Sequence, residues 1–132
     1  MKNKFDKGYI VCQPGWEYND EVYYRMSDDA ISDSLGKIYL DKEEAQKEVD
    51  ELSISNWSNI NLLEYGYGVE DFLIDEKEWG ADKLKIFIEE IGGKIVDEWD
   101  WRTPATMKIE DIRFIEEKTY LSFAYLQELD II

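Results

Sequence analysis

The sequence has no histidine and a single cysteine in 132 residues. Without imidazole it has no Ser-His-Asp or Cys-His catalytic constellation and no zinc site with histidine ligands. One cysteine makes neither an intrachain disulfide nor a thiolate cluster. Cys12 follows the apolar run Tyr9–Val11, which favours a small buried thiol over a nucleophile. These absences exclude the commonest kinds of catalytic centre.

Long hydrophobic runs, phosphate-binding glycine motifs and proline-rich linkers are also missing. The run Tyr9–Cys12 is too short for a signal-peptide core, and no stretch approaches a membrane span. The two prolines and eight glycines are scattered, and neither GxxxxGK[ST] nor GxGxxG occurs. We therefore expect a cytoplasmic protein with one domain, residues 1–132, and no cofactor.

Basic residues are few, at 15 against 31 acids, and the formal net charge is −16. Binding to nucleic acid or to an anionic membrane is disfavoured, because both depend on Lys and Arg meeting phosphates. Apolar residues make up 44% and aromatics 14% of the chain, a composition that favours a folded core over disorder. The acidity indicates either a basic protein partner or a role in solubility alone.

Hydrophobic periodicity predicts an α+β fold. The clearest helix begins at Asp41, which with Glu44 resembles a capping box, and Ala45 and Val49 recur at helical spacing. We expect one mainly antiparallel sheet of four to five strands with about three helices packed on one face. A strand at each terminus could pair and close the domain, although the sequence alone does not fix the strand order. The predicted strands are 7–13, 21–26, 37–40, 94–101 and 121–132; the predicted helices are 41–56, 81–93 and 108–120; 56–79 is mixed loop and short elements.

Aromatic and acidic residues alternate in two stretches, "GWEYNDEVYY" at 15–24 and "VDEWDW" at 96–101. Tyr and Trp are preferred anchors of protein interfaces, and carboxylates around them select a basic partner. As a continuous strand, "VDEWDW" places Trp99 and Trp101 on one face together with Asp97. The predicted partner-binding residues are Trp16, Glu17, Tyr18, Asp20, Glu21, Asp97, Glu98, Trp99, Asp100 and Trp101.

Carboxylates are the one catalytic group in good supply, so a carboxylate-dependent hydrolase or a Mg²⁺ enzyme is an alternative. With 31 acids, however, close pairs arise by chance, and no catalytic or metal-binding residue is assigned. A housekeeping or scaffold domain whose acidity serves only solubility is a further alternative.

The stretch "GWEYNDEVYY", followed by "GKIYLDKEEAQKEVDEL", resembles a family of small uncharacterised bacterial proteins with a strand, an "EYNDE"-like turn and an alanine-containing helix. This resemblance covers the first third of the chain and implies no activity. In size and acidity the chain is also similar to immunity proteins and phage anti-defence inhibitors. The leading hypothesis is a non-enzymatic inhibitor that occludes a basic surface of a nucleic-acid-acting enzyme, with carboxylates where phosphates would lie.

Overall fold

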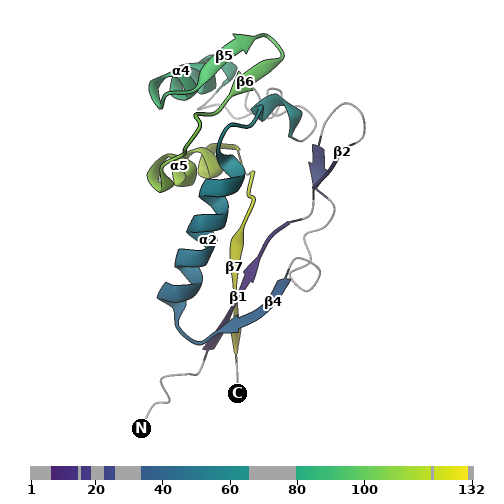
Figure 1. Cartoon of the computed structure of the whole chain (residues 1–132), viewed down its shortest axis with the longest axis vertical. Helices are drawn as coiled ribbons and strands as arrows, with labels where there is room; N and C mark the ends of the chain where they lie inside the picture. The colour runs from purple at the N-terminus through teal and green to yellow at the C-terminus, as the bar shows by residue number, and fades with distance from the viewer. Residues whose placement is uncertain are drawn as a thin grey trace.

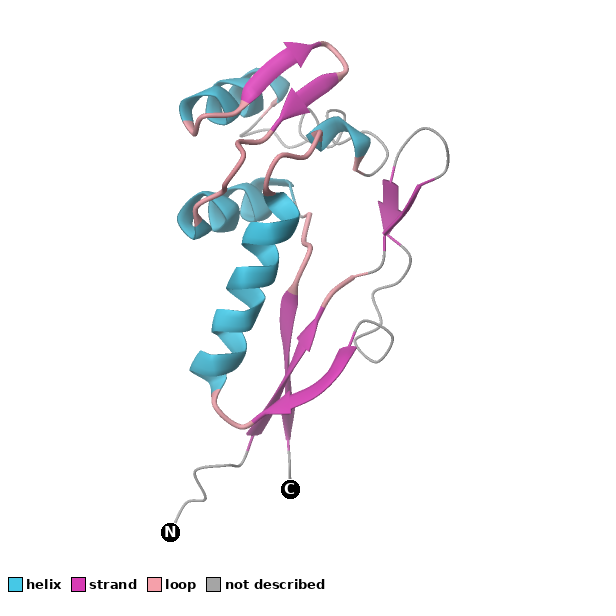
Figure 2. Cartoon of the chain, in the orientation of Figure 1, coloured by secondary structure: helices cyan, strands magenta, loops and turns pink. Residues whose placement is uncertain are grey.

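A computed structural model describes residues 7–14, 16–18, 23–25, 34–65, 80–119 and 121–130 (Figure 1). Within these ranges the fold is α+β, as the sequence predicts, and every paired strand is antiparallel (Figure 2). No helix of the described part is long and apolar enough to cross a bilayer. The predicted Asp20 and Glu21 lie outside the described residues.

The largest sheet has three strands in the order β4-β1-β7. β1 (Lys7–Cys12) lies in the centre, between β4 (Ser34–Tyr39) and β7 (Tyr125–Asp130). The first and last of the strands predicted from the sequence do pair, because Lys7 stands opposite Asp130 and Cys12 opposite Tyr125. The first and last described strands are therefore neighbours in this sheet, with β1 in the centre and β7 at one edge.

Two shorter pairs of strands stand apart from this sheet, so the strands are not gathered in one sheet. β2 (Trp16–Tyr18) pairs with β3 (Tyr23–Arg25), and β5 (Lys94–Asp97) pairs with β6 (Asp100–Arg102). Figure 1 shows the β5–β6 hairpin beside α4, at the opposite end of the molecule from the three-stranded sheet. The helices are therefore divided between the sheets, since α2 contacts the three-stranded sheet and α4 contacts the β5–β6 hairpin.

Helix α2 (Lys42–Trp57) packs on the three-stranded sheet and contacts all three of its strands. It begins where the sequence predicts, since the Asp41 carboxylate accepts a hydrogen bond from the Glu43 backbone N–H at 2.9 Å. This N-cap bond uses Glu43 rather than the Glu44 of a capping box. Between α2 and the sheet lies a small core of Val11, Ala45, Val49 and Ala124.

The larger core is formed by side chains from the end of α2, from α4 (Ala81–Glu90), from α5 (Ile109–Thr119) and from the hairpin. A short 3₁₀ helix, η1 (Leu62–Glu64), follows α2. Trp57 and Phe123 meet edge to face in this core, with ring centroids 5.0 Å apart. Its buried members are Trp57, Leu62, Leu84, Ile88, Trp101, Met107, Ile112, Ile115, Leu121 and Phe123.

The strands differ in part from the predicted ones. β4 begins at Ser34, three residues before the predicted strand 37–40, and β2 lies where no strand was predicted. The predicted strand 121–132 is shorter, since β7 begins at Tyr125. Leu121 instead donates its N–H to the Thr119 hydroxyl, at 3.3 Å, and Phe123 is buried in the larger core. Burial of these side chains between helices, rather than sheet pairing, explains their apolar character.

Candidate interaction hairpin

The stretch "VDEWDW" forms a hairpin, so the prediction of one continuous strand over 94–101 is wrong. The chain reverses at Glu98 and Trp99, and Asp97 pairs with Asp100. The Asp97 carboxylate accepts a hydrogen bond from the Trp99 backbone N–H at 2.7 Å. Such side-chain bonds to the backbone two residues on are the reason that Asp favours turns. Asp97, which the sequence analysis placed on one face of a continuous strand, therefore stabilises the turn instead.

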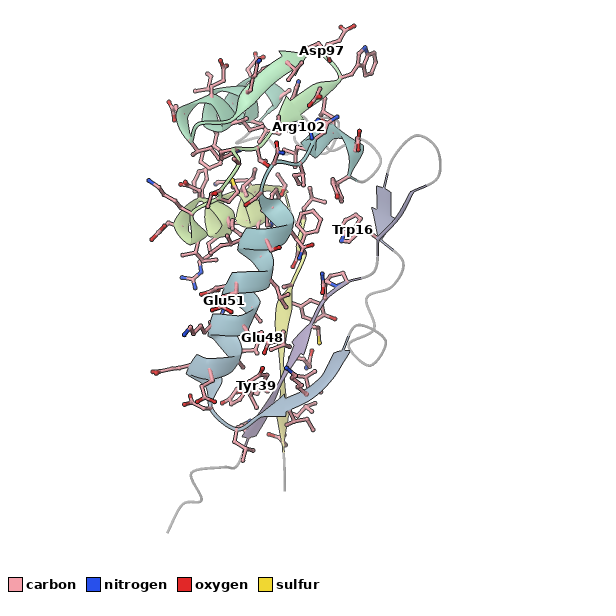
Figure 3. The ribbon with its side chains drawn as sticks, viewed as in Figure 1. Trp16, Tyr39, Glu48, Glu51, Asp97 and Arg102 are labelled. Carbon is pink, nitrogen blue, oxygen red and sulfur yellow. The ribbon has the colours of Figure 1, made fainter. Side chains whose placement is uncertain are left out.

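The reversal separates two tryptophans that a continuous strand would have placed together. Trp99 lies in the turn with 75% of its surface exposed, whereas Trp101 in β6 is 1% exposed and belongs to the larger core. The expected shared face of Trp99, Trp101 and Asp97 is thus wrong. Figure 3 shows Asp97 at the far end of the hairpin and Arg102 nearer its base.

Asn61, at the start of η1, holds the hairpin turn to the rest of the fold. Its side-chain amide donates to the Trp99 carbonyl at 3.0 Å, and its oxygen accepts from the Trp101 N–H at 3.1 Å. The same oxygen accepts from the Leu63 N–H at 3.2 Å and so caps η1. Asn61 is itself buried, which strengthens these bonds relative to water. The sequence analysis did not single out this residue.

Thr103 continues this bracing beyond β6. Its hydroxyl donates to the Trp57 carbonyl at 2.6 Å and accepts from the Ile60 N–H at 3.0 Å. The Thr103 N–H donates in turn to the Ile60 carbonyl at 3.0 Å. Because Thr103 is buried, these bonds tie the base of the hairpin to the end of α2. The hairpin is therefore fixed at its turn and at its base.

Helix α4 approaches the hairpin through its C-terminal glycines. Gly92 has a φ of 97°, and the Gly93 N–H donates to the Ile88 carbonyl at 2.8 Å, as in a Schellman motif. A Cβ on Gly93 would lie 2.5 Å from the Arg102 carbonyl oxygen. Glycine at this position thus allows the helix end and β6 to lie in close contact.

The charged residues of the hairpin differ in their surroundings. Asp97 and Glu98 are exposed, whereas Asp100 is partly buried and its carboxylate lies 3.0 Å from the Arg102 guanidinium. A partly exposed pair of this kind adds about 0–1 kcal/mol to stability. Lys85 from α4 places its ammonium 5.0 Å from the centre of the Trp101 ring. Asp97 and Glu98 are consequently the carboxylates available next to Trp99.

The other predicted stretch is placed differently. Trp16 is partly buried and packs against Tyr65 and Phe123, with ring centroids 5.5 and 5.6 Å away. Figure 3 shows its side chain directed toward the helices rather than outward. The backbones of Glu17 and Tyr18 pair with β3. The structure therefore does not bring Trp16 together with the exposed Trp99.

A second feature was missed from the sequence: a cleft of about 320 Å³ between α2, α5 and the chain that leads into β7. Its polar lining includes Asp50, Arg113 and Glu116. Glu116 lies four residues after the buried Ile112 and three before the buried Thr119, on the inward stripe of α5. A carboxylate on such a stripe was the available signal. It was overlooked because acids are so common in this chain.

Within the described ranges, no group of three or more His, Cys, Asp or Glu residues is placed to hold a metal ion. Comparisons of the chain with family models, with curated proteins and with solved structures find no match. The similarity of the first third to a bacterial family stays a prediction.

Proposed function

We propose that this chain is an acidic, non-enzymatic binding protein of the cytoplasm that docks on a basic surface of another protein through the β5–β6 hairpin. The observation that carries the proposal is the contrast between Trp99, 75% exposed in the turn, and Trp101, 1% exposed in the core. A large aromatic side chain held in water is an anchor ready for a partner's pocket.

The energy available from Trp99 is substantial. A tryptophan buries about 150–250 Å² on full burial, so three-quarters of this area at about 25 cal/mol per Å² corresponds to roughly 3–5 kcal/mol. The turn is already held by Asn61 and by the Asp97 carboxylate. A pre-formed loop loses little conformational entropy on binding, so most of this energy contributes to affinity.

The charge around the anchor favours a basic partner. Asp97 and Glu98 are exposed beside Trp99, and the whole chain carries a formal net charge of −16. Such a field speeds encounter with a cationic surface and penalises an acidic one. Enzymes that act on nucleic acid carry cationic surfaces of this kind for phosphate. We therefore extend the proposal to inhibition of such an enzyme, as an immunity or anti-defence protein, by steric occlusion.

The test is affinity purification of the tagged protein from its native host, followed by binding measurements on the recovered partner. Trp99→Ala should weaken binding at least about 30-fold, the equivalent of a 2 kcal/mol anchor. Ile38→Ala is the matched control, since Ile38 is also an exposed apolar residue but lies on β4. The control should bind like the unmodified protein.

The charge component needs a separate measurement. The double variant Asp97→Asn with Glu98→Gln should slow association and reduce its dependence on salt, with a smaller effect on dissociation. Equal affinity of Trp99→Ala and the unmodified protein would refute the role of the hairpin. A partner with an acidic contact surface, or a complex insensitive to salt, would refute the electrostatic part.

A further inference from the structure

The cleft between α2, α5 and the chain leading into β7 has the composition of a small-ligand site. Its volume of about 320 Å³ lies at the lower end of the range for ligand pockets. Its lining includes the apolar side chains of Val49, Leu121 and Leu126 together with charged groups. A cleft with both kinds of lining residue suits a short aliphatic ligand that ends in a polar group.

The third charged group of this cleft is Glu116, and no Lys or Arg among the described residues forms an ion pair with it. Its carboxylate accepts a hydrogen bond from the Trp57 indole N–H at 3.3 Å and a further one from the Phe123 backbone. Both donors are neutral. Burial raises the pKa of Glu116 above its ordinary value, and these hydrogen bonds and Arg113 offset that rise only in part. A cation beside this carboxylate would compensate for the hydration free energy that the charged group loses on burial.

The other charges of the cleft already neutralise each other. Arg113 donates to one oxygen of Asp50 at 3.0 Å, and the Gln46 amide donates to the other oxygen at 2.9 Å. The ion pair leaves the net charge of this lining at that of Glu116 alone. A ligand cation is therefore directed to Glu116 rather than to Asp50.

We propose that this cleft binds an alkylammonium or alkylguanidinium group, with its charge at Glu116 and its aliphatic stem along Val49, Leu121 and Leu126. The cleft of about 320 Å³ is large enough to admit a group of the size of an arginine or lysine side chain. Such a group is supplied either by a free small molecule or by a basic side chain of a polypeptide. The inference does not rest on the proposed function, because the cleft is built from elements other than the hairpin.

The probes are n-butylguanidinium and its neutral relative n-butylurea, added to ¹⁵N-labelled protein at low salt. Butylguanidinium should shift the Trp57 indole N–H and the Phe123 amide resonances with saturation and a Kd on the order of 1 mM, as its few atoms allow. Butylurea, which has the same stem without the charge, should bind at least about tenfold more weakly.

Glu116→Gln tests the receptor group and should weaken butylguanidinium binding at least about tenfold. Glu117→Gln is the matched control, since it removes the same charge from an exposed neighbour on α5 and should change affinity little. Glutamine keeps a carbonyl oxygen for the Trp57 N–H, and the unchanged amide spectrum elsewhere establishes that the variant is folded.

A second arm separates the two sources of the cation. Tighter binding of acetyl-Gly-Arg-Gly-amide than of butylguanidinium supports a polypeptide side chain as the ligand, and binding of butylguanidinium alone supports a free small molecule. Absence of saturable shifts at 20-fold the expected Kd would overturn the proposal. Equal binding by butylurea, or by the Glu116→Gln variant, would overturn it as well.

Discussion

Replacement of Asn61 by alanine should release the hairpin turn on which the proposed function depends. The change removes three hydrogen bonds, to Trp99, Trp101 and Leu63. The Trp101 N–H is buried and would lose its partner, at a cost of about 1–3 kcal/mol. The other two bonds are partly buried and contribute about 0.5–1.5 kcal/mol each. Because such terms are not fully additive, the expected loss is about 2–4 kcal/mol.

Urea unfolding followed by circular dichroism measures this loss as a lower midpoint at an unchanged slope. Asn56→Ala is the matched control, because Asn56 makes one bond, from its amide to the Leu52 carbonyl at 2.8 Å in α2. Its loss is offset by the better helix propensity of alanine, so the control should change stability by less than about 1 kcal/mol.

Hydrogen exchange localises the effect. In the Asn61→Ala variant the Trp101 amide should exchange faster relative to amides of α2 than it does in the unmodified protein. If Asn61→Ala costs no more than Asn56→Ala, the three bonds do not hold the hairpin. The same conclusion would follow from unchanged protection of the Trp101 amide.

Three further predictions concern the cores and the cleft. Gly93→Ala should destabilise the fold by at least about 1–3 kcal/mol, because its Cβ would meet the Arg102 backbone, whereas Gly80→Ala meets no atom within 4 Å and should be near neutral; thermal unfolding compares the two. Trp101→Ala should cost about 3–5 kcal/mol and Trp99→Ala less than about 0.5 kcal/mol in the same assay, and equal losses would contradict their different burial. Glu116→Gln should stabilise the protein at pH 7. Burial raises the folded-state pKa of the Glu116 carboxyl, which lies near Asp50 and Arg113. The contribution of the neutral carboxyl to stability is therefore present below its ordinary pKa of 4.5 and is lost as pH rises through the raised value. At pH 7 the buried carboxylate destabilises the fold, and glutamine removes that charge. The stability difference between variant and unmodified protein should vanish below pH 4.5, and a difference independent of pH would contradict this origin.

Local patterns predicted the helices well because their causes lie within a few residues. The periodic apolar positions Ala45 and Val49 and the N-cap Asp41 specify α2 without help from distant parts of the chain. The glycines after α4 likewise specify its end. The α+β class follows from the alternation of such segments.

The candidate site was predicted only in part. The stretch at 96–101 was identified, but its two tryptophans were assigned to one face. Period-two alternation describes a strand and a short hairpin equally well until the turn is known. The turn here is held by Asn61, about 40 residues earlier in the chain. The cleft was missed for a similar reason, since its walls come from α2, α5 and the start of β7.

The sequence by itself determined the main helices, the α+β class and the acidity of the chain, whereas the order and pairing of the strands depended on the tertiary structure. Only the tertiary structure decided that Trp101 is core and Trp99 is exposed, and that Glu116 faces a cleft. The physical reason is that propensity and capping act over neighbouring residues, whereas burial depends on which distant segments pack together.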